Sequence, residues 1–290
     1  MAAGARAVSV EGPEAAILAG QMRRELAGRT VTGFALGDTG RLQEIGFMNR
    51  EAGDYGQLVG GAVESVVSRG NTVLMKLDNG QNVVISPEYG GDIFLWEQEG
   101  SLPEKHHLRL EFEDGSFLTV RITSMGGVTA TCDAGLPHHY LVARDFAPET
   151  LAPLDPDAGG FTLERFSAAL QTANKAMKTV LVGKEAVVVG ISNSTFQDVL
   201  YRAGIHPKRR ASDLSPDERL ALFEAIRFVM DERLRLGGKD QWRDLYRRPG
   251  GYVPAMGPGM GGRACAKCGG TIEKLALGGG DVNLCPVCQR

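Results

Sequence analysis

The chain contains 290 residues, of which 43% are hydrophobic, so it is long enough and apolar enough for two domains with buried cores. No apolar run approaches the ~20 residues that a membrane-spanning helix needs, and the N-terminus has no charged segment followed by a long apolar core, so we expect neither a membrane protein nor a secreted one. The formal net charge is −3. However, residues 161–290 hold 20 Lys and Arg against 13 Asp and Glu, so the second half of the chain is basic. This asymmetry is either a chance division of surface charge or the mark of a half that contacts a polyanion.

The first half of the chain is predicted to be a helix followed by antiparallel strands. Residues 1–9 are mostly small, and we expect a flexible tail. Between Pro13 and Gly28, apolar residues recur at every fourth position, at Leu18, Met22 and Leu26, which is typical of an amphipathic helix. Apolar or alternating runs then predict strands, joined by tight turns, at 72–77, 82–85, 107–112 and 117–122. Residues 10–150 are therefore predicted to form a β domain.

The second half is predicted to be helical. A linker rich in Pro and Gly at 151–160 precedes predicted helices at 161–171, 175–182 and 194–203. A further helix begins at Ser215-Pro216-Asp217-Glu218, which has the pattern of a capping box with proline in the first turn. We expect this helical domain to end at residue 248, and a flexible Gly-rich strap to follow at 249–262 before the C-terminal segment.

Four cysteines lie in this C-terminal segment, in two C-x2-C pairs separated by sixteen residues: Cys265, Cys268, Cys285 and Cys288. Each pair can turn both thiolates toward one ion, and two pairs complete a tetrahedral shell with no position left for a substrate. Two disulfides are the alternative, but they would need an oxidising compartment. The spacing therefore predicts one structural Zn²⁺ and a location in the reducing cytoplasm.

Several motifs, in chain order, resemble the formamidopyrimidine-DNA glycosylase and endonuclease VIII family. Val10-Glu11-Gly12-Pro13-Glu14 is similar to the N-terminal Pro-Glu-Gly-Pro-Glu of endonuclease VIII, and Ser68-Arg69-Gly70-Asn71 is similar to its Arg-Gly-Lys hairpin. Gly190-Ile191-Ser192-Asn193, a helix, and Ala203-Gly204-Ile205-His206-Pro207 resemble its helix–two-turn–helix. The resemblance implies an α+β fold with an antiparallel β-sandwich flanked by helices, a helix–two-turn–helix domain and a four-cysteine zinc-finger hairpin, with DNA in the cleft between domains.

The residues of the basic half support binding of nucleic acid. Asn193 precedes a predicted helix, so its side chain and the free N–H groups of the first turn can hold a phosphate, although a plain helix cap is the simpler interpretation. Lys208, Arg209 and Arg210 can contact the nucleic-acid backbone, or can form an ordinary solvated run of charge. Together with the resemblance, they favour phosphate contacts.

The chain departs from the family at the positions that carry its chemistry. The family uses the amine of an N-terminal proline as nucleophile, and here the matching residue is Val10, whose nitrogen is a peptide amide unless processing exposes it. Glu11 remains, and it either does acid/base work or stabilises the N-terminus of the helix that follows. The hairpin lysine of the family is replaced by Asn71, which supplies neither a charge nor an amine.

The residues that the family inserts beside a lesion are also replaced. The family's arginine lies twelve residues past the second cysteine, where this chain has Gly280, followed by Asp281, which would repel phosphate. The family's Asp-Pro-Arg-Arg-Phe-Gly loop corresponds to residues 123–127, which contain neither Arg nor Phe. The family inserts a third side chain beside a lesion, and Tyr89 lies near the position that corresponds to it. Tyr89 either stacks on a base or belongs to the core.

Three functions follow from these observations. We favour a DNA-binding, DNA-repair related member of the family whose degenerate active site lacks the proline-dependent glycosylase and AP-lyase reactions. The alternatives are a monofunctional glycosylase that uses Glu11 as acid/base, and a non-catalytic module that binds RNA or protein. We expect double-stranded or damaged DNA as the partner, no membrane contact, and a monomer.

Overall fold

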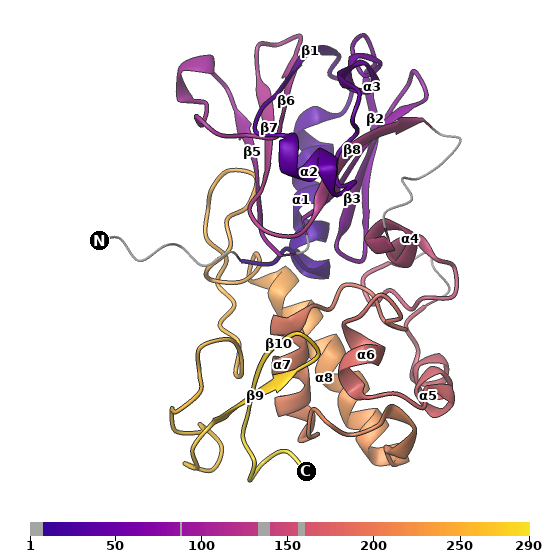
Figure 1. The fold of residues 1–290 in the computed structure, drawn as a ribbon, viewed down its shortest axis with the longest axis vertical. Coiled ribbons are helices and arrows are strands. Elements are labelled where there is room, and N and C mark those ends of the chain that lie inside the picture. Colours follow the sequence, from indigo (N-terminus) through magenta and orange to yellow (C-terminus); the bar gives the residue numbers. More distant parts are fainter. Residues whose placement is uncertain (1–7, 88, 133–139, 156–159) are drawn as a thin grey trace.

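The computed structural model describes residues 8–87, 89–132, 140–155 and 160–290, which form a lobe of strands and a lobe of helices (Figure 1). Most of the predicted N-terminal tail and residues 156–159 of the predicted linker lie outside the described residues. Among the helices that the structure describes, none combines the length and the apolar character that crossing a membrane requires.

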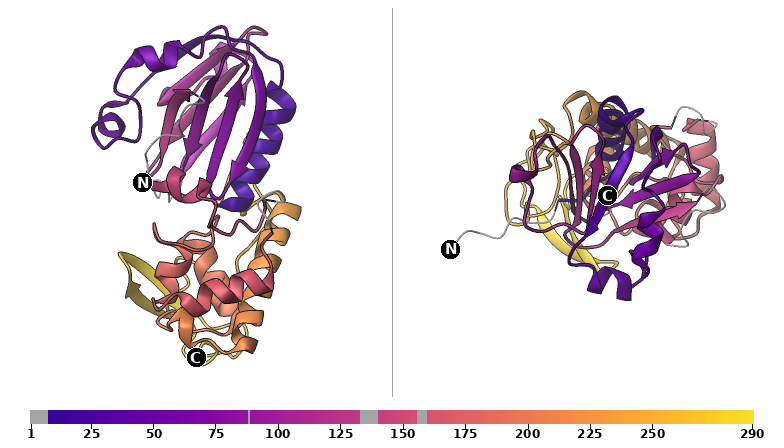
Figure 2. Two further views of the ribbon diagram at one scale, coloured as in Figure 1. Left: turned by 90° about the vertical axis from the view of Figure 1, so that its right-hand side faces the viewer. Right: turned by 90° about the horizontal axis from the view of Figure 1, so that it is seen from above.

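The strand lobe is a sandwich of antiparallel sheets (Figure 2). One sheet has the order β1 (Val31–Leu36), β6 (Leu108–Phe112), β7 (Phe117–Ile122) and β5 (Gly91–Trp96). The other has the order β2 (Val63–Arg69), β3 (Thr72–Leu77), β4 (Gln81–Ser86) and β8 (Gly127–Cys132). The strands predicted at 72–77 and 117–122 are confirmed, and those predicted at 82–85 and 107–112 are β4 and β6 with slightly different ends.

Strand β6 shows the alternation between buried and partly exposed residues that is expected of a sheet with one buried face. Along β6, Leu108, Leu110 and Phe112 are buried, while the residues between them are partly exposed. The predicted turns between neighbouring strands contain Gly80 (φ 77°) and Gly115 (φ 79°), where a positive φ favours glycine. Local turns thus fix which faces of these strands meet.

The helix α1 (Gly12–Leu26) confirms the predicted N-terminal helix. Its buried stripe of Leu18, Met22 and Leu26 belongs to the sandwich core, and the helix packs against β2 and β3. Glu11 is the N-cap residue of α1 and forms a capping box with Glu14. Because α1 also contacts the last long helix of the other lobe, α8 (Pro216–Arg235), its first turn lies at the junction of the two lobes (Figure 2).

Short helices lie between the strands of this lobe in the chain or follow them. They are α2 (Gly40–Glu44), α3 (Ala52–Gly56), the 3-10 helix η1 (Glu99–Ser101) and α4 (Tyr140–Phe146). Val142 and Phe146 of α4 pack on Leu74 of β3 and Val84 of β4. The second sheet is therefore covered on its outer face, which explains why β3 and β4 are buried along most of their length.

The helical lobe contains α5 (Leu163–Thr172), α6 (Met177–Leu181), α7 (Asn193–Ala203), the 3-10 helix η2 (Ala211–Asp213) and α8. The helices predicted at 161–171, 175–182 and 194–203 correspond to α5, α6 and α7, with ends that differ by one or two residues. α7 ends at Gly204 (φ 73°), and α8 begins with the predicted capping box between Ser215 and Glu218. These helices share a core of their own.

The segment after α8 returns to the strand lobe before it reaches the C-terminus. Trp242 and Leu245 are buried in the sandwich core, so the predicted helical domain, which was to end at 248, shares its last part with the other lobe. The strap predicted to be flexible is packed, because Tyr252 joins the helical core and Met256 joins a small core beside the cysteines. Glycine content alone overestimated the freedom of this segment.

The C-terminal hairpin consists of β9 (Glu273–Leu277) and β10 (Gly280–Leu284). Its two turn residues, Gly278 (φ 54°) and Gly279 (φ 76°), both have the positive φ that a type I′ turn requires. Val282 of β10 is buried in the core of the helical lobe, so the hairpin is docked on that lobe.

Candidate functional site

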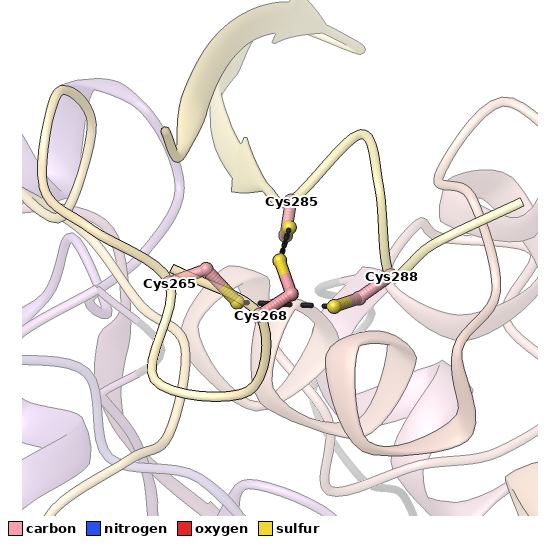
Figure 3. A group of neighbouring side chains, drawn as sticks. All are labelled: Cys265, Cys268, Cys285 and Cys288. Atoms are coloured by element: carbon pink, nitrogen blue, oxygen red, sulfur yellow. Dashed lines mark hydrogen bonds between the residues drawn. The ribbon is translucent and has the colours of Figure 1, made fainter. Parts of the chain in front are cut away.

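The four C-terminal cysteines converge on one point, as predicted (Figure 3). Their Sγ atoms all lie within 4.8 Å of one another, with 3.9 Å between Cys265 and Cys288 and 3.5 Å between Cys268 and Cys285. Zn–S bonds of about 2.3 Å in a tetrahedral shell require S–S separations of about 3.8 Å, whereas a disulfide requires about 2.05 Å. The cluster therefore fits a single metal ion bound by four thiolates.

Val10 is fully buried at the junction of the lobes. Its backbone N–H donates to the Pro87 carbonyl at 3.4 Å, so this nitrogen is a peptide amide engaged in a hydrogen bond. Two residues later, the N–H of Gly12 donates to the carbonyl of Gly190 at 2.9 Å, and a Cβ on Gly12 would lie 3.1 Å from the Gly190 Cα. The start of α1 is thus held between the sandwich and the segment that leads into α7.

The Glu11 carboxylate is fully buried against the first turn of α7. Its Oε1 accepts hydrogen bonds from the N–H groups of Ser192 at 2.9 Å and Thr195 at 3.2 Å, and from the Ser192 hydroxyl. Its Oε2 accepts hydrogen bonds from the hydroxyl groups of Ser194 at 2.7 Å and Thr195 at 2.9 Å. An internal carboxylate therefore uses two of the N–H groups at this helix N-terminus, which the sequence suggested could hold a phosphate.

Arg233 and Lys239 surround the same carboxylate with positive charge. Arg233 of α8 donates to Glu11 Oε2 at 2.7 Å and also pairs with Glu14. Lys239 Nζ lies 2.9 Å from Glu11 Oε2 and 2.7 Å from the Ser9 carbonyl oxygen. Burial raises the pKa of Glu11, but the charges of Lys239 and Arg233 outweigh burial and hold that pKa well below 4.5. Glu11 therefore stays ionised in a cluster whose charges balance.

Asn71 is fully buried at the turn between β2 and β3. Its backbone N–H donates to the Asp145 carboxylate at 2.8 Å, and the Thr72 hydroxyl donates to the same carboxylate at 2.9 Å. At Gly70 (φ 58°) a Cβ would lie 2.5 Å from Asp145 Cγ, so the turn fits closely against α4. Neither polar atom of the Asn71 side chain has a hydrogen-bond partner among the described residues. The position that matches the family's lysine is thus buried and carries no charge.

A cleft with a volume of about 750 Å³ lies between the sandwich, the helical lobe and the C-terminal hairpin. The sandwich contributes Tyr89, Ser124 and Met125, and the N–H of Tyr89 donates to the Met125 carbonyl at 2.9 Å. Tyr89 is therefore a residue of the cleft wall, and not of the core. Asn193 lines the opposite side, so the structure brings these two predicted residues to one cleft while Val10, Glu11 and Asn71 are buried.

Lys178 of α6 is a further cation of this cleft, which the sequence patterns did not reveal. Its Nζ donates to the carbonyl of Leu277 in the hairpin at 2.5 Å, and Asn193 Nδ2 donates to the carbonyl of Asp281 at 3.0 Å. Burial lowers the pKa of Lys178, and nearby Asp281 acts in the opposite direction.

Asn193 is the first residue of α7, with Ser192 as the N-cap, and not the residue before the helix as the sequence suggested. The side chains of Lys178 and Asn193 thus both hydrogen-bond the hairpin to the helical lobe.

In the basic run that follows α7, Lys208–Arg210, one residue forms an ion pair and the other two are exposed. Arg209 donates to both carboxylate oxygens of Glu218, at 2.9 and 3.1 Å, so its guanidinium already has a bidentate partner. Lys208 and Arg210 are exposed, and Arg210 donates to the side-chain oxygen of Asn174 at 2.7 Å. Lys208 and Arg210 are the members of this run that can reach a phosphate most readily.

The hairpin turn presents glycines, and its acidic residue is paired. Asp281 Oδ2 lies 2.7 Å from Lys274 Nζ across the two strands, and both side chains are more than half exposed. Such an exposed pair contributes about 0–1 kcal/mol to stability, but it reduces the repulsion that Asp281 alone would exert on phosphate. Gly280 itself offers no side chain to a ligand.

Known proteins share both halves of this architecture. The family profile described as the formamidopyrimidine-DNA glycosylase N-terminal domain matches residues 10–123, and that of the formamidopyrimidine-DNA glycosylase H2TH domain matches residues 151–242. The formamidopyrimidine-DNA glycosylase of Geotalea daltonii is 32% identical over 243 residues, which cover 80% of this chain and 84% of the relative. The chain belongs to the formamidopyrimidine-DNA glycosylase family. The enzyme of that name from Roseiflexus sp. is 31% identical and covers 80% of this chain and 83% of its own.

Solved structures of formamidopyrimidine-DNA glycosylases have the same fold. The MutM (Fpg) protein of Thermus thermophilus gives a TM-score of 0.80 at 23% identity, covering 96% of this chain and 98% of that one. A complex between Lactococcus lactis Fpg and DNA containing an abasic site gives 0.79 at 21% identity, covering 97% and 99%. The predicted α+β fold, with its sandwich, helix–two-turn–helix domain and cysteine hairpin, is confirmed.

Arg233 and Lys239 were not among the predicted site residues, although the sequence held an indirect signal for them. Glu11 and Glu14 flank Pro13 at the start of a helix whose apolar stripe must be buried, and carboxylates buried with that turn need cationic partners. The partners lie more than 200 residues further along the chain, so the sequence could indicate their charge but not their positions.

Proposed function

We propose that this chain is a DNA-binding, DNA-repair related member of the formamidopyrimidine-DNA glycosylase family that does not carry out the proline-dependent glycosylase and AP-lyase reactions. The observation that carries the proposal is the buried charge cluster around Glu11. The family's reaction, as the resemblance implies it, needs a free amine at the position of Val10 and a carboxylate beside it that exchanges protons. Here the nitrogen is an amide, and the carboxylate is saturated with donors.

Glu11 is poorly suited to acid/base work in this state. A general acid or base must reach the reacting group and is most effective with a pKa near the working pH. The Glu11 carboxylate is fully buried, and its pKa lies well below 4.5. It holds no proton to donate near neutral pH, and its oxygens accept hydrogen bonds from α7, Arg233 and Lys239. These facts favour a role in joining the lobes over a role in catalysis.

Binding to the DNA backbone remains compatible with the cleft. Lys178 and Asn193 line one wall, Tyr89 and Met125 line the other, and Lys208 and Arg210 lie exposed after α7. Cations and amides of this kind position a duplex through its phosphates without reading a particular base. The Lactococcus lactis relatives were solved with DNA that contains Fapy-dG or an abasic site, which supports a duplex or damaged DNA as the partner of this chain.

A base-release assay separates the proposal from a monofunctional glycosylase. Duplexes that carry a formamidopyrimidine or an oxidised pyrimidine would be incubated with the unmodified protein, with Glu11→Gln, and with Glu149→Gln as an exposed control. We expect no release of base by any of the three proteins. Release by the unmodified protein and by Glu149→Gln would contradict the proposal. Loss of that release in a Glu11→Gln variant shown to be folded by circular dichroism would identify Glu11 as the acid/base residue of an active glycosylase.

A salt series tests the type of binding. Affinities for intact duplex, abasic duplex and structured RNA would be measured over a range of salt concentrations. Backbone contacts predict that the logarithm of the binding constant falls linearly with the logarithm of salt, by about 0.9 for each phosphate neutralised on B-DNA, with little preference for the lesion. A clear preference for structured RNA would contradict the proposed partner.

We also propose that the ion is Zn²⁺ and that the protein works as a monomer in the cytoplasm. Four thiolates in a tetrahedral cluster favour zinc over harder cations, and these thiols persist in a reducing compartment. Elemental analysis of protein prepared without added metal should find one zinc per chain. Iron in place of zinc, or a disulfide-linked form without metal, would contradict this assignment.

A further inference from the structure

The helix α7 presents one stripe of polar side chains to the cysteine hairpin. Asn193, Gln197 and Tyr201 lie at successive turns of the helix. Asn193 and Gln197 contact the hairpin, and Tyr201 contacts the first of the two C-x2-C pairs, which we call knuckles. Asn193 donates to the Asp281 carbonyl at 3.0 Å. Gln197 Oε1 accepts the backbone N–H of Asn283 at 2.8 Å and its side-chain Nδ2 at 3.1 Å. The stripe thus runs from the cleft to the metal cluster.

Tyr201 brings this stripe into contact with a metal ligand. The side chain is buried in the small core with Met256 and Ile272, and its Oη lies 3.2 Å from Cys265 Sγ. Either atom of this pair could be the donor by geometry, but with a metal bound Cys265 would be a thiolate without a proton, and the phenol would then donate. A phenylalanine would fill the same space equally well, so packing alone does not explain the hydroxyl group.

Lys267 ties the first knuckle to the same helix from the other side. It lies between Cys265 and Cys268, and its Nζ donates to the carbonyls of Tyr201 at 2.9 Å and Arg202 at 3.3 Å. The ammonium group also lies 4.5 Å from the centre of the Tyr201 ring. The last carbonyls of a helix attract cations, so the knuckle caps the C-terminus of α7.

We propose that Tyr201 is a positioning residue of the metal centre, whose hydroxyl donates to the metal-bound thiolate of Cys265 and couples occupancy of the centre to α7. Cys265 and Cys268 of one knuckle and Cys285 and Cys288 of the other would hold the ion together, and four protein ligands would leave no position for a substrate. Four thiolates around a divalent cation carry a net negative charge, which the Tyr201 hydrogen bond and the Lys267 ammonium offset. The same contacts hold the helix whose first residue, Asn193, lines the cleft.

Tyr201→Phe tests this role, with Tyr55→Phe as a matched control. Tyr55 is also buried, and its hydroxyl donates to the Val128 carbonyl at 2.8 Å in the sandwich. Competition with a chromophoric chelator would measure the affinity for zinc in both variants and in the unmodified protein. Loss of a hydrogen bond to a ligand typically lowers metal affinity about 10–100-fold, and we expect a loss of this size for Tyr201→Phe and none for Tyr55→Phe.

Cobalt(II) substitution gives a second readout that does not depend on stability. A hydrogen bond to a thiolate stabilises the sulfur orbitals from which charge is transferred to cobalt. The sulfur-to-cobalt absorption band of Tyr201→Phe should therefore move to longer wavelength, while that of Tyr55→Phe keeps its position. Zinc affinity and band position that match the unmodified protein would overturn the proposal, and neither measurement requires nucleic acid, so the test is separate from that of DNA binding.

Discussion

At the scale of single residues, the Glu11 carboxylate joins elements that are far apart in the chain. It caps α1, accepts N–H groups of α7, and pairs with Arg233 of α8 and with Lys239. A buried charge is tolerated only when its partners satisfy it, and removal of one partner leaves the others uncompensated. The effect of a substitution here should therefore depend on which charge remains unpaired.

The pH dependence of stability tests the ionisation state of Glu11. Because the native pKa lies below the ordinary value of 4.5, the unfolded chain binds the proton more readily in this range, and the stabilisation from ionised Glu11 is lost as the pH falls through the native pKa. The difference in unfolding free energy between the unmodified protein and Glu11→Gln should be constant above about pH 5.5 and should shrink at lower pH. Urea denaturation measures it. A difference that grows on acidification would mean a raised pKa.

Lys239→Met should destabilise the junction strongly. The variant keeps most of the side-chain volume but leaves Glu11 and Glu14 with Arg233 as the charged partner, and breaking a buried pair costs about 3–5 kcal/mol. Lys105→Met is the control, since Lys105 is exposed and such surface changes stay within about 0.5 kcal/mol. Chemical denaturation of both variants measures the effect. A Lys239→Met variant as stable as the control would show that the cluster contributes little.

At the scale of elements, those with local signals were predictable and those held by distant partners were not. The cap at Ser215, the end of the predicted helix at Ala203 and the convergence of the four cysteines all depend on neighbouring residues, and all were confirmed. β5 and β8 were foreseen only as parts of a β domain, because their burial comes from pairing with β7 and β4. Lys178 and Lys239 gain their positions from tertiary packing, which no sequence period reports.

The hairpin turn offers a test of the arginine that the family resemblance implies at the position of Gly280. Gly280 does not have a positive φ, and a Cβ there meets only Lys178 Nζ at 3.6 Å, so Gly280→Arg fits the fold. A new cation at the cleft should raise the affinity for duplex DNA and steepen its salt dependence by about 0.9 in slope. Gly53→Arg, in α3 and with open space around its Cβ, adds the same charge at the far end of the sandwich (Figure 1). Equal slopes for both variants would place the hairpin turn outside the DNA site.

At the scale of the whole molecule, the lobes have separate apolar cores and meet through a polar junction. The hydrogen bonds from Ser192 and Lys239 to Glu11 span 181 and 228 residues of sequence. Contacts of such long range cannot be inferred from local patterns, whereas the overall order of sandwich, helical domain and hairpin could be predicted. The junction thus ties the two lobes together through Glu11 and its partners on both sides.

Removal of the metal should affect one lobe more than the other. The hairpin contributes Val282 to the helical core, and Lys267, between Cys265 and Cys268, caps α7. The four clustered cysteines all lie outside the sandwich. A chelator should therefore reduce protection from amide hydrogen exchange in α7 and the hairpin, and leave β3 and β4 protected. Equal loss of protection in both lobes would mean that they unfold as one unit.

Borohydride trapping on abasic duplex DNA tests the central claim most directly, because reduction captures only a Schiff base between an amine of the protein and the sugar C1′. A family member with an N-terminal proline serves as the positive control, and a gel-shift assay confirms that the duplex is bound under the same conditions. We predict a stable non-covalent complex and no covalent adduct. A covalent adduct in good yield would show that an amine of this chain attacks the sugar, and would contradict the proposal that the reaction has been lost.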